Sequence, residues 1–417
     1  MNRHVLVIGN GGREHAICKK LLESPLVKKV YCAKGNPGML QDNITLVDIE
    51  YSDHNEIILF CQTHQIDWVL VGPEQPLING LIDDLMHAGI KAFGPTKKAA
   101  QIEGSKEFAK KLMSKYNIPT ASYQSFSDYS SAIDYVKNQN FPLVIKADGL
   151  AAGKGVQIVN SQGEAKACLT DFLVKNQFCS HKPKVIIEEF LIGKEFSLLS
   201  FVNSTGIYPM VSAKDYKAIY NGDEGPNTGG MGAYSPVSYV TPEIEKIVID
   251  TIITPTVEGL KVEGLPFEGV LYTGLILTND GPKVIEYNTR FGDPETQVIL
   301  NRLESDFYKV VEALINQEIP QISWKNKGVS LGVVVAAKGY PGKYEKGVLL
   351  PKFKKEEEVS LYFSGVKKEK GNLISDGGRV FLAEVEGRSH EEANKKMYHW
   401  LKSNELEQFY YRKDIGK

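Results

Sequence analysis

The chain has 417 residues, of which 42% are hydrophobic and 24% charged, and its formal net charge is −2. This composition is typical of a soluble globular protein, and the weak net charge gives no general attraction to nucleic acid. No apolar run is long enough to span a membrane, and the amino-terminal residues lack a signal-peptide pattern. The five cysteines are scattered without a CxxC pair, which indicates reduced thiols and argues against a zinc site. We therefore expect a cytoplasmic protein without a membrane partner.

The first hundred residues alternate between strand and helix patterns. Strands are expected at Val5–Ile8, Lys29–Ala33, Trp68–Val71 and Lys91–Phe93, and helices at Glu14–Leu22, Asn55–Gln62 and Asn79–His87. Such alternation predicts a parallel, Rossmann-like sheet with helices on both faces.

The stretch GNGGREHA follows the first expected strand and resembles a dinucleotide fingerprint, but it fails that pattern twice. Gly9 and Gly11 match GxGxxG, whereas Glu14 occupies the third glycine position. The second strand also ends at Lys34 without the acid that would bind a ribose. The amides of Gly11 and Gly12, beside Arg13, instead favour a site for one phosphate monoester, and a purely structural turn remains open. His15, next to this turn, is expected to pack or cap rather than to react.

VGPEQPL follows another expected strand, at the edge of the sheet where ligands bind in open α/β folds. Glu74 in this stretch is a candidate acceptor for sugar hydroxyls, and a surface carboxylate is the alternative.

From about residue 104 the pattern changes to an α+β type. The chain shows a helix at Ser130–Asn138, strand patterns in PLVIKAD, GVQIVN and KVIIEEFL, and longer strands at Glu195–Val202, Val270–Leu277 and KVIEYN. Between them lies the glycine-rich polar stretch KDYKAIYNGDEGPNTGGMGAYSP. A structureless segment of that length is usually either disordered or functional. A third unit of short strands begins at about residue 326, with a helix near Glu391–Leu401.

IKADGLAAGKGV lacks the Ser or Thr that a Walker P-loop needs, and strand patterns flank it on both sides. We interpret it as a flap that closes over phosphates, with Lys146 on the strand and Lys154 on the flap. Surface lysines are the alternative. In the next stretch, backbone groups near Glu189 to Leu191 would read an adenine, and Glu195 would accept hydrogen bonds from its ribose. A charged strand end is the alternative there.

KVIEYNTRFGDPETQ carries the sharpest pattern. Residues two apart on a strand share a face, so Glu286, Asn288 and Arg290 are expected to point the same way. A carboxylate and an amide oxygen suit Mg²⁺, which also binds substrate phosphates. Arg290 would add a cation for a transferred phosphoryl group or a carboxylate.

These stretches together resemble the glycinamide ribonucleotide synthetase family of the ATP-grasp superfamily, from end to end. The resemblance rests on GNGGREHA, VGPEQPL, GPTKKAAQIEGSK, IKADGLAAGKGV, EEFL, GPNTGGMGAYSP, RFGDPETQ, SLGVVVAAKGYPG and YYRKDIG. It implies a multidomain α/β and α+β protein. The expected parts are an N-terminal domain (1–103) that binds phosphoribosylamine, a central ATP-grasp domain (104–325) whose flap-bearing subdomain spans about 120–190, and a small β-rich C-terminal domain (326–417).

The family's reaction would join glycine to 5-phosphoribosylamine through glycyl phosphate, with ATP and Mg²⁺ or Mn²⁺, in a monomer that binds only small molecules. Several residues carry over for ATP and metal: Lys106, Lys146 and Lys154 for the phosphates; Glu188, Glu189, Phe190 and Leu191 for adenine; Glu195 for ribose; and Glu286 and Asn288 for the metal. Others carry over for the substrates: Asp215 and Arg290 for glycine, with Gly292 and Asp293 nearby; and Asn10, Gly11, Gly12, Arg13, Glu14 and Glu74 for phosphoribosylamine.

One departure from the superfamily is that GVLYTGLIL supplies no metal carboxylate, which leaves the metal shell open. The alternatives are another ATP-grasp carboxylate–amine ligase, a nicotinamide-dependent dehydrogenase and a catalytically silent nucleotide-binding module.

Overall fold

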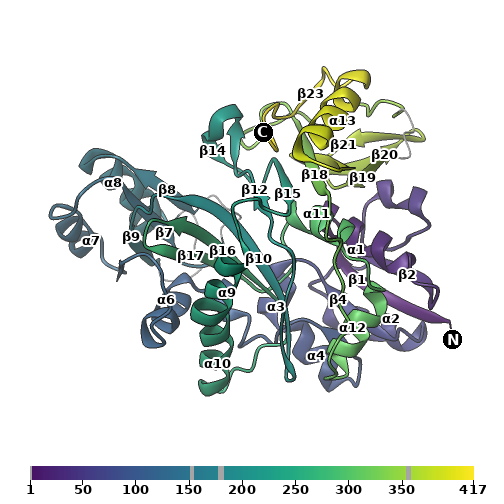
Figure 1. Cartoon of the computed structure of the whole chain (residues 1–417), viewed down its shortest axis with the longest axis horizontal. Coiled ribbons are helices and arrows are strands. Elements are labelled where there is room, and N and C mark those ends of the chain that lie inside the picture. Colours follow the sequence, from purple (N-terminus) through teal and green to yellow (C-terminus); the bar gives the residue numbers. More distant parts are fainter. Residues whose placement is uncertain (1, 151–154, 177–182, 354–357) are drawn as a thin grey trace.

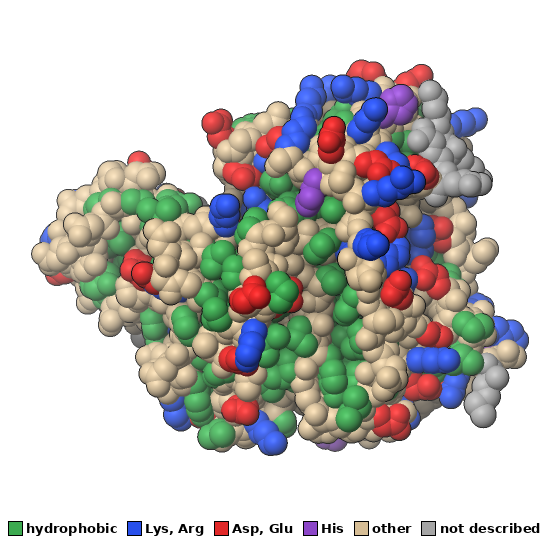
Figure 2. Space-filling model, in the orientation of Figure 1, with side chains coloured by type: hydrophobic (Ala, Val, Ile, Leu, Met, Phe, Trp, Pro, Cys, Tyr) green, Lys and Arg blue, Asp and Glu red, His purple; other side chains and the backbone are tan. Residues whose placement is uncertain are grey.

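The computed structural model describes residues 2–150, 155–176, 183–353 and 358–417. Figure 1 shows the N-terminal and C-terminal parts packed side by side, while the lobe that carries α7 (Tyr129–Val136) and α8 (Gln162–Leu169) projects away from both. In the space-filling view the surface is indented between this lobe and the rest of the molecule (Figure 2). None of the helices within the described ranges is long and apolar enough to cross a membrane.

The N-terminal part is a five-stranded parallel sheet in the order β3-β2-β1-β4-β5. On β1, Val5 and Val7 pack on the side of α1 and α12, whereas Leu6 and Ile8 pack on the side of α2 and α4, so helices cover both faces as predicted. The strands are β1 (Arg3–Gly9), β2 (Val27–Lys34), β3 (Thr45–Val47), β4 (Trp68–Val71) and β5 (Ala92–Phe93). The helices are α1 (Gly12–Leu22), η1 (Pro37–Asp42), α2 (His54–Thr63), α3 (Glu74–Asn79) and α4 (Leu81–His87).

The helix expected at Asn79–His87 is present as α4, but it begins two residues later, at Leu81, and the helix α3 before it was not predicted. Two helices, α3 and α4, meet at Gly80, whose φ of +96° is left-handed. That conformation ends the first helix, and glycine adopts it without a steric penalty.

The central part contains two four-stranded antiparallel sheets, β6-β9-β7-β8 and β11-β10-β16-β17. Their strands are β6 (Tyr123–Phe126), β7 (Leu143–Ala147), β8 (Val156–Val159), β9 (Val185–Glu189), β10 (Lys194–Asn203), β11 (Gly206–Pro209), β16 (Gly269–Thr278) and β17 (Gly281–Asn288). The helices are α5 (Gln101–Gly104), α6 (Lys106–Lys115), α7 (Tyr129–Val136), α8 (Gln162–Leu169), η2 (Thr170–Val174), α9 (Pro242–Val248), η4 (Ile249–Ile253), α10 (Thr254–Val262), α11 (Glu295–Asn301) and α12 (Phe307–Ile315). All predicted central strands are present.

The glycine-rich stretch after residue 213 is not structureless, contrary to the expectation. It forms β12 (Lys214–Asp215), β13 (Ala218–Tyr220), η3 (Asn221–Asp223), β14 (Glu224–Asn227) and β15 (Gly232–Ser235). Its backbone finds partners outside the segment, because β15 pairs with β18 of the C-terminal part.

The C-terminal sheet runs β12-β15-β18-β22-β19, with β23 also paired to β18. Its strands are β18 (Val329–Ala337), β19 (Val359–Phe363), β22 (Arg379–Gly387) and β23 (Phe409–Tyr410), beside the hairpin β20 (Val366–Glu369) and β21 (Asn372–Ser375) and helix α13 (His390–Ser403). Two of these strands, β18 and β22, have 9 residues each, so the expectation of short strands holds only for the others. The sheet includes strands from both sides of residue 326.

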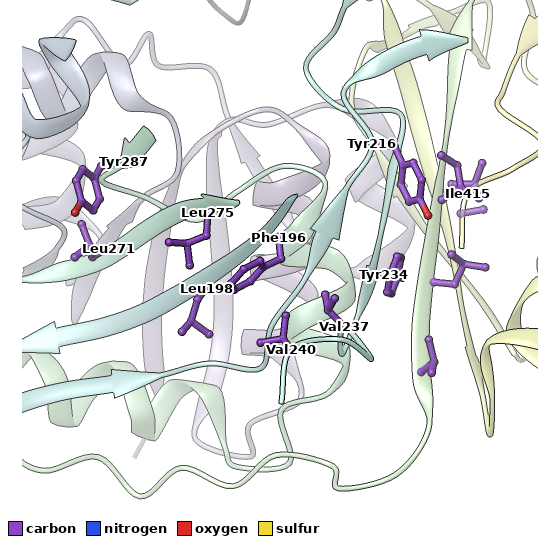
Figure 3. Packing of buried hydrophobic residues seen from close by; sticks show 14 of the residues in the cluster. Phe196, Leu198, Tyr216, Tyr234, Val237, Val240, Leu271, Leu275, Tyr287 and Ile415 are labelled. Atoms are coloured by element: carbon purple, nitrogen blue, oxygen red, sulfur yellow. The ribbon is translucent and has the colours of Figure 1, made fainter. Parts of the chain in front are cut away.

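One hydrophobic cluster joins the central and C-terminal parts. Figure 3 shows Phe196, Leu198 and Leu275 packed together, with Tyr216, Tyr234 and Ile415 farther along the same core. Burial of this continuous core fixes the two parts relative to each other.

Candidate active site

A cavity of about 470 Å³ lies where the three parts meet. It collects most of the residues that the sequence singled out, from six separate stretches of the chain. Those that line it are Arg13, Glu74, Lys146, Glu188, Glu189, Phe190, Leu191, Glu195, Asp215, Glu286, Asn288, Arg290, Gly292 and Asp293. A smaller cavity of about 120 Å³ shares several of them and adds Lys106 and Gly149.

Four predicted residues of the N-terminal turn do not line these two cavities: Asn10, Gly11, Gly12 and Glu14. Lys154 lies outside the described residues.

Three lysines gather at the small cavity. Glu188 on β9 is buried and forms ion pairs with Lys110 and Lys146, each at 3.0 Å between nitrogen and oxygen. Lys106, at the start of α6, donates to the carbonyl of Gly149 at 2.7 Å. Burial lowers the pKa of Lys106, and it lowers that of Lys110 to about 8. Two of the three, Lys106 and Lys146, are the lysines expected at the phosphates. Lys110 was not predicted from the sequence, because its spacing on α6 is that of an ordinary helix lysine.

The end of β17 has the alternation that the sequence predicts. Tyr287 and Thr289 are buried, while Glu286, Asn288 and Arg290 face the cavities. The Arg290 guanidinium donates to Asn288 Oδ1 at 3.3 Å.

Lys217 pairs with Glu286 at 3.4 Å, and this lysine, against the effect of burial, holds the pKa of the Glu286 carboxyl below its usual range. Across the described ranges there is no group of three or more His, Cys, Asp and Glu side chains that could hold a metal ion. The oxygens of Glu286 and Asn288 nevertheless fit a hard cation that takes its other ligands from phosphates and water.

Arg290 is held by two carboxylates from other elements. Its Nη2 lies 3.1 Å from Glu103 Oε1, and its Nε lies 3.3 Å from Glu74 Oε2. Glu103 also accepts from the backbone and hydroxyl of Thr289, at 2.7 and 2.9 Å. Glu103 was missed as a site residue, although it lies in the motif GPTKKAAQIEGSK, because a buried carboxylate cannot be told from an exposed one by spacing.

A second acidic group lies around Asp215. Burial, together with the charges of Glu295, Glu195 and Glu286, raises the pKa of Asp215 to about 7, and Lys217 opposes that rise. Glu295 in turn accepts from the Tyr272 hydroxyl at 2.8 Å. Lys217 and Glu295 were not predicted, although they stand two residues after Asp215 and within the GDPET stretch.

At the N-terminal turn, where a phosphate site is expected, two backbone amides have partners within the protein. The Gly11 amide donates to Glu14 Oε2 at 2.6 Å, and the Gly12 amide donates to Ser364 Oγ at 2.7 Å. Gly9 has a φ of +128°, and a Cβ atom there would collide with the Glu14 side chain. Both amides therefore have hydrogen-bond acceptors within the protein, as expected if the turn has a purely structural role.

Asp293 carries the charge contacts on this side of the cavity. Burial opposes its ionisation, but Arg379 and Arg13 outweigh that effect and hold the pKa of Asp293 below its usual range. Arg379 Nη2 lies 2.9 Å from Asp293 Oδ2, and the same side chain donates to the carbonyls of Asp293 and Gly229. Arg379 comes from β22 and had no motif to mark it.

His15 packs, as predicted. Its ring is fully buried, its Nε2 lies 2.8 Å from Asp42 Oδ2, and its Nδ1 accepts from the Phe363 amide at 2.9 Å. The four cysteines in the described ranges are free thiols.

Comparison with protein families gives three consecutive matches along the chain. Residues 3–103 match the N domain of phosphoribosylglycinamide synthetase, residues 104–296 its ATP-grasp domain and residues 330–417 its C domain. The chain is 50% identical over 415 residues to the phosphoribosylamine–glycine ligase of Listeria innocua, and it covers 99% of each sequence. It is 49% identical over 414 residues to that of Streptococcus pneumoniae, with 99% of this chain and 98% of that one covered.

Solved structures agree in fold. The phosphoribosylamine–glycine ligase of Thermotoga maritima superposes with a TM-score of 0.85 at 32% identity, over 99% of this chain and 100% of that one. The biotin carboxylase domain of the Hydrogenobacter thermophilus 2-oxoglutarate carboxylase, solved with MgADP and bicarbonate, has a TM-score of 0.75 at 15% identity, over 99% and 92%. At that identity the likeness shows the fold alone.

Proposed function

The chain belongs to the phosphoribosylglycinamide synthetase family, and from that premise we propose which of its residues carry out the family's reaction. It is an ATP-dependent ligase of purine biosynthesis that joins glycine to 5-phosphoribosylamine. The products are glycinamide ribonucleotide, ADP and phosphate. The residue roles, the metal ion, the domain boundaries at 103 and 325 and a cytoplasmic location are our proposals.

Lys106 and Lys146 bind the phosphates of ATP. The backbone from Glu188 to Leu191 borders the adenine, and Glu195 accepts hydrogen bonds from the ribose. Support comes from the adjoining cavities, which are lined by all of these residues. Two ammonium groups in a partly closed cavity attract a triphosphate strongly, because few water molecules screen them.

Glu286 and Asn288 hold Mg²⁺ or Mn²⁺. Their hard oxygens and their place on one face of β17 fit that role. The ion would neutralise negative charge on the triphosphate during transfer.

Asp215 and Arg290 orient glycine. An ionised Asp215 attracts the ammonium group, and Arg290 attracts the carboxylate. The carboxylate attacks the γ-phosphate to form glycyl phosphate and release ADP, and the amine of phosphoribosylamine then displaces phosphate. No protein nucleophile is needed, so positioning and charge neutralisation supply the catalysis.

Phosphoribosylamine binds at the N-terminal turn, against Arg13, Glu74, Gly292 and Asp293. Glu14 forms an ion pair with Arg13 at 2.6 Å, and Asn10 is exposed at the start of the turn. Because Glu14 and Ser364 already occupy the turn's amides, the charge for the phosphate comes from Arg13 and its neighbour Arg379.

One observation carries the assignment of roles: the lysines, Glu286 and Asn288 of β17 and the arginines around Asp293 line adjoining cavities. The test is ADP release with each substrate omitted in turn. We expect release to require glycine and to rise further with phosphoribosylamine. Release that ignores glycine would contradict the proposal and favour another carboxylate–amine ligase.

A further inference from the structure

The stretch YYRKDIG has no role in the reaction described above, yet it makes a dense set of contacts. We call residues 409–416 the tail segment. It is bonded to residues 216–222 by the Tyr410 hydroxyl to Ile219 O, Arg412 Nη1 to Ala218 O, the Lys413 amide to Asn221 Oδ1, the Gly222 amide to Asp414 Oδ2 and the Gly416 amide to the Tyr216 hydroxyl, at 2.8 to 3.1 Å.

The side chains of residues 215–217 alternate between the cavity and the tail segment. Asp215 and Lys217 line the cavity, whereas Tyr216 between them is buried on the opposite side. Figure 3 shows the Tyr216 ring beside Ile415. The tail segment therefore lies directly behind the two charged residues.

Arg412 is the centre of this contact. Its side chain is 0% exposed, its Nε and Nη2 donate to both oxygens of Asp414, and its Nη1 also reaches Asp223 at 2.8 Å. Its guanidinium carbon lies 5.0 Å from the centre of the Tyr216 ring, in cation–π geometry. The planar guanidinium group donates to several acceptors in fixed directions and so holds these acceptors in one arrangement, which the ammonium group of a lysine cannot do.

The strand that carries Asp215 needs such support. β12 has only 2 residues and is the edge of its sheet, where it pairs with β15, and a single bridge from Ala213 to Ser197 precedes it. Ordering the next few residues costs about 1 to 2 kcal/mol each in backbone entropy, which contacts from elsewhere must offset.

We infer that the tail segment, through Arg412 and Ile415, is a positioning element for glycine binding: it fixes Tyr216 and thereby holds Asp215 and Lys217 toward the cavity. This inference rests on the proposed role of Asp215. It assigns Arg412 no contact with substrate.

The test is Arg412→Met, with steady-state kinetics for each substrate. We expect the KM for glycine to rise about tenfold while the KM for ATP changes less than about twofold, because Asp215 and Lys217 are displaced and Lys106 and Lys146 are not. Arg412→Lys keeps the charge but not the planar guanidinium group, so it should recover only part of the loss.

The matched control is Arg302→Met. Arg302 is also buried, donates to the carbonyls of Lys325, Lys327 and Gly328, and does not line the cavity. It should lower stability and leave the KM for glycine unchanged. If Arg412→Met raises the KM values for glycine and ATP alike, or neither, the inference is wrong.

Should Arg412→Met fail to fold, Asp223→Ala decides the matter. The Asp223 side chain is 58% exposed and is only one of the partners of Arg412. A rise of about threefold in the KM for glycine alone supports the inference, and no change overturns it. Wild-type ADP release that ignores glycine would instead overturn the proposed function, so the two failures are distinguishable.

Discussion

The end of β17 lines the cavity, whereas the N-terminal turn adjoins it only through Arg13, and the two are held in place in different ways. At β17 the alternation of Glu286, Asn288 and Arg290 follows from the strand itself, and no distant contact is needed to explain it. At the turn, Gly12 donates to Ser364, which is 352 residues away in the sequence. The comparison teaches that the direction of a side chain on a strand follows from the local sequence. Whether a backbone amide in a loop is free to bind a ligand depends instead on contacts with residues far away in the sequence.

The largest effect is expected at β17, where the arrangement follows from the strand itself. Glu286→Ala should lower turnover at least about a hundredfold, equivalent to about 3 kcal/mol, because it removes a charge that we place at the metal. Asp280→Ala, in the exposed turn before β17, is the control and should retain activity. Normal turnover of the Glu286 variant, in a protein that still unfolds cooperatively, would refute the role.

The next prediction concerns a contact between residues that are far apart in the sequence, made by α11. This helix follows the GDP of RFGDPETQ, and its last residue, Asn301, donates to Glu384 on β22 at 3.1 Å. Burial raises the pKa of Glu384 from 4.5 to about 7. Between those two pH values the unfolded chain loses the proton while the folded protein keeps it, so stability falls as pH rises through this window and is level above it.

Glu384→Gln should remove that loss. Its amide keeps a partner, because the Ser330 hydroxyl, 2.7 Å away, can rotate to accept. At about pH 8 the variant should be more stable than wild type by up to about 3 kcal/mol, and at about pH 4.5 the two should agree. Urea unfolding at both pH values measures this. An advantage that is equal at both pH values would show that Glu384 does not titrate in this window.

A smaller effect is expected at Glu195, the proposed ribose contact. Glu195→Ala should raise the KM for ATP about tenfold and leave the KM for glycine within about twofold, because one charge-assisted hydrogen bond to the ribose is lost. The side chain is exposed, and Tyr239 bonds only its backbone carbonyl, so the fold should be unaffected. An unchanged KM for ATP would remove Glu195 from the nucleotide site.

The smallest effect is expected at the N-terminal turn. Ser364→Ala leaves the Gly12 amide without its acceptor and should lower the free energy of unfolding by about 1 kcal/mol. The KM for phosphoribosylamine should change less than twofold, measured by initial rates. Markedly tighter binding would mean that the freed amide serves the phosphate, as the sequence first suggested.

The sequence predicted the fold well because its signals are local. β1 and β4 are apolar runs, and the residues at the end of β17 alternate between buried and cavity-lining positions. It missed the break at Gly80, since nothing local marks a glycine that is left-handed rather than helical. It also missed β15, whose pairing partner β18 lies about 100 residues later.

The candidate site divides in the same way. Motifs pointed to Lys146, Glu286 and Asn288, which line the cavity. Glu103 and Arg379 were missed because their part in the site depends on burial and on contacts with Arg290 and Asp293. Burial of a charged residue is a property of the folded protein, and spacing along the chain does not reveal it.

The central claim is that this cavity activates the glycine carboxylate on the γ-phosphate before the amine attacks. Glycine labelled with ¹⁸O in its carboxylate tests it directly, by mass spectrometry of the phosphate released in a reaction with ATP and phosphoribosylamine. We predict one labelled oxygen in the phosphate for each glycinamide ribonucleotide formed. Unlabelled phosphate, formed together with the product, would contradict the account.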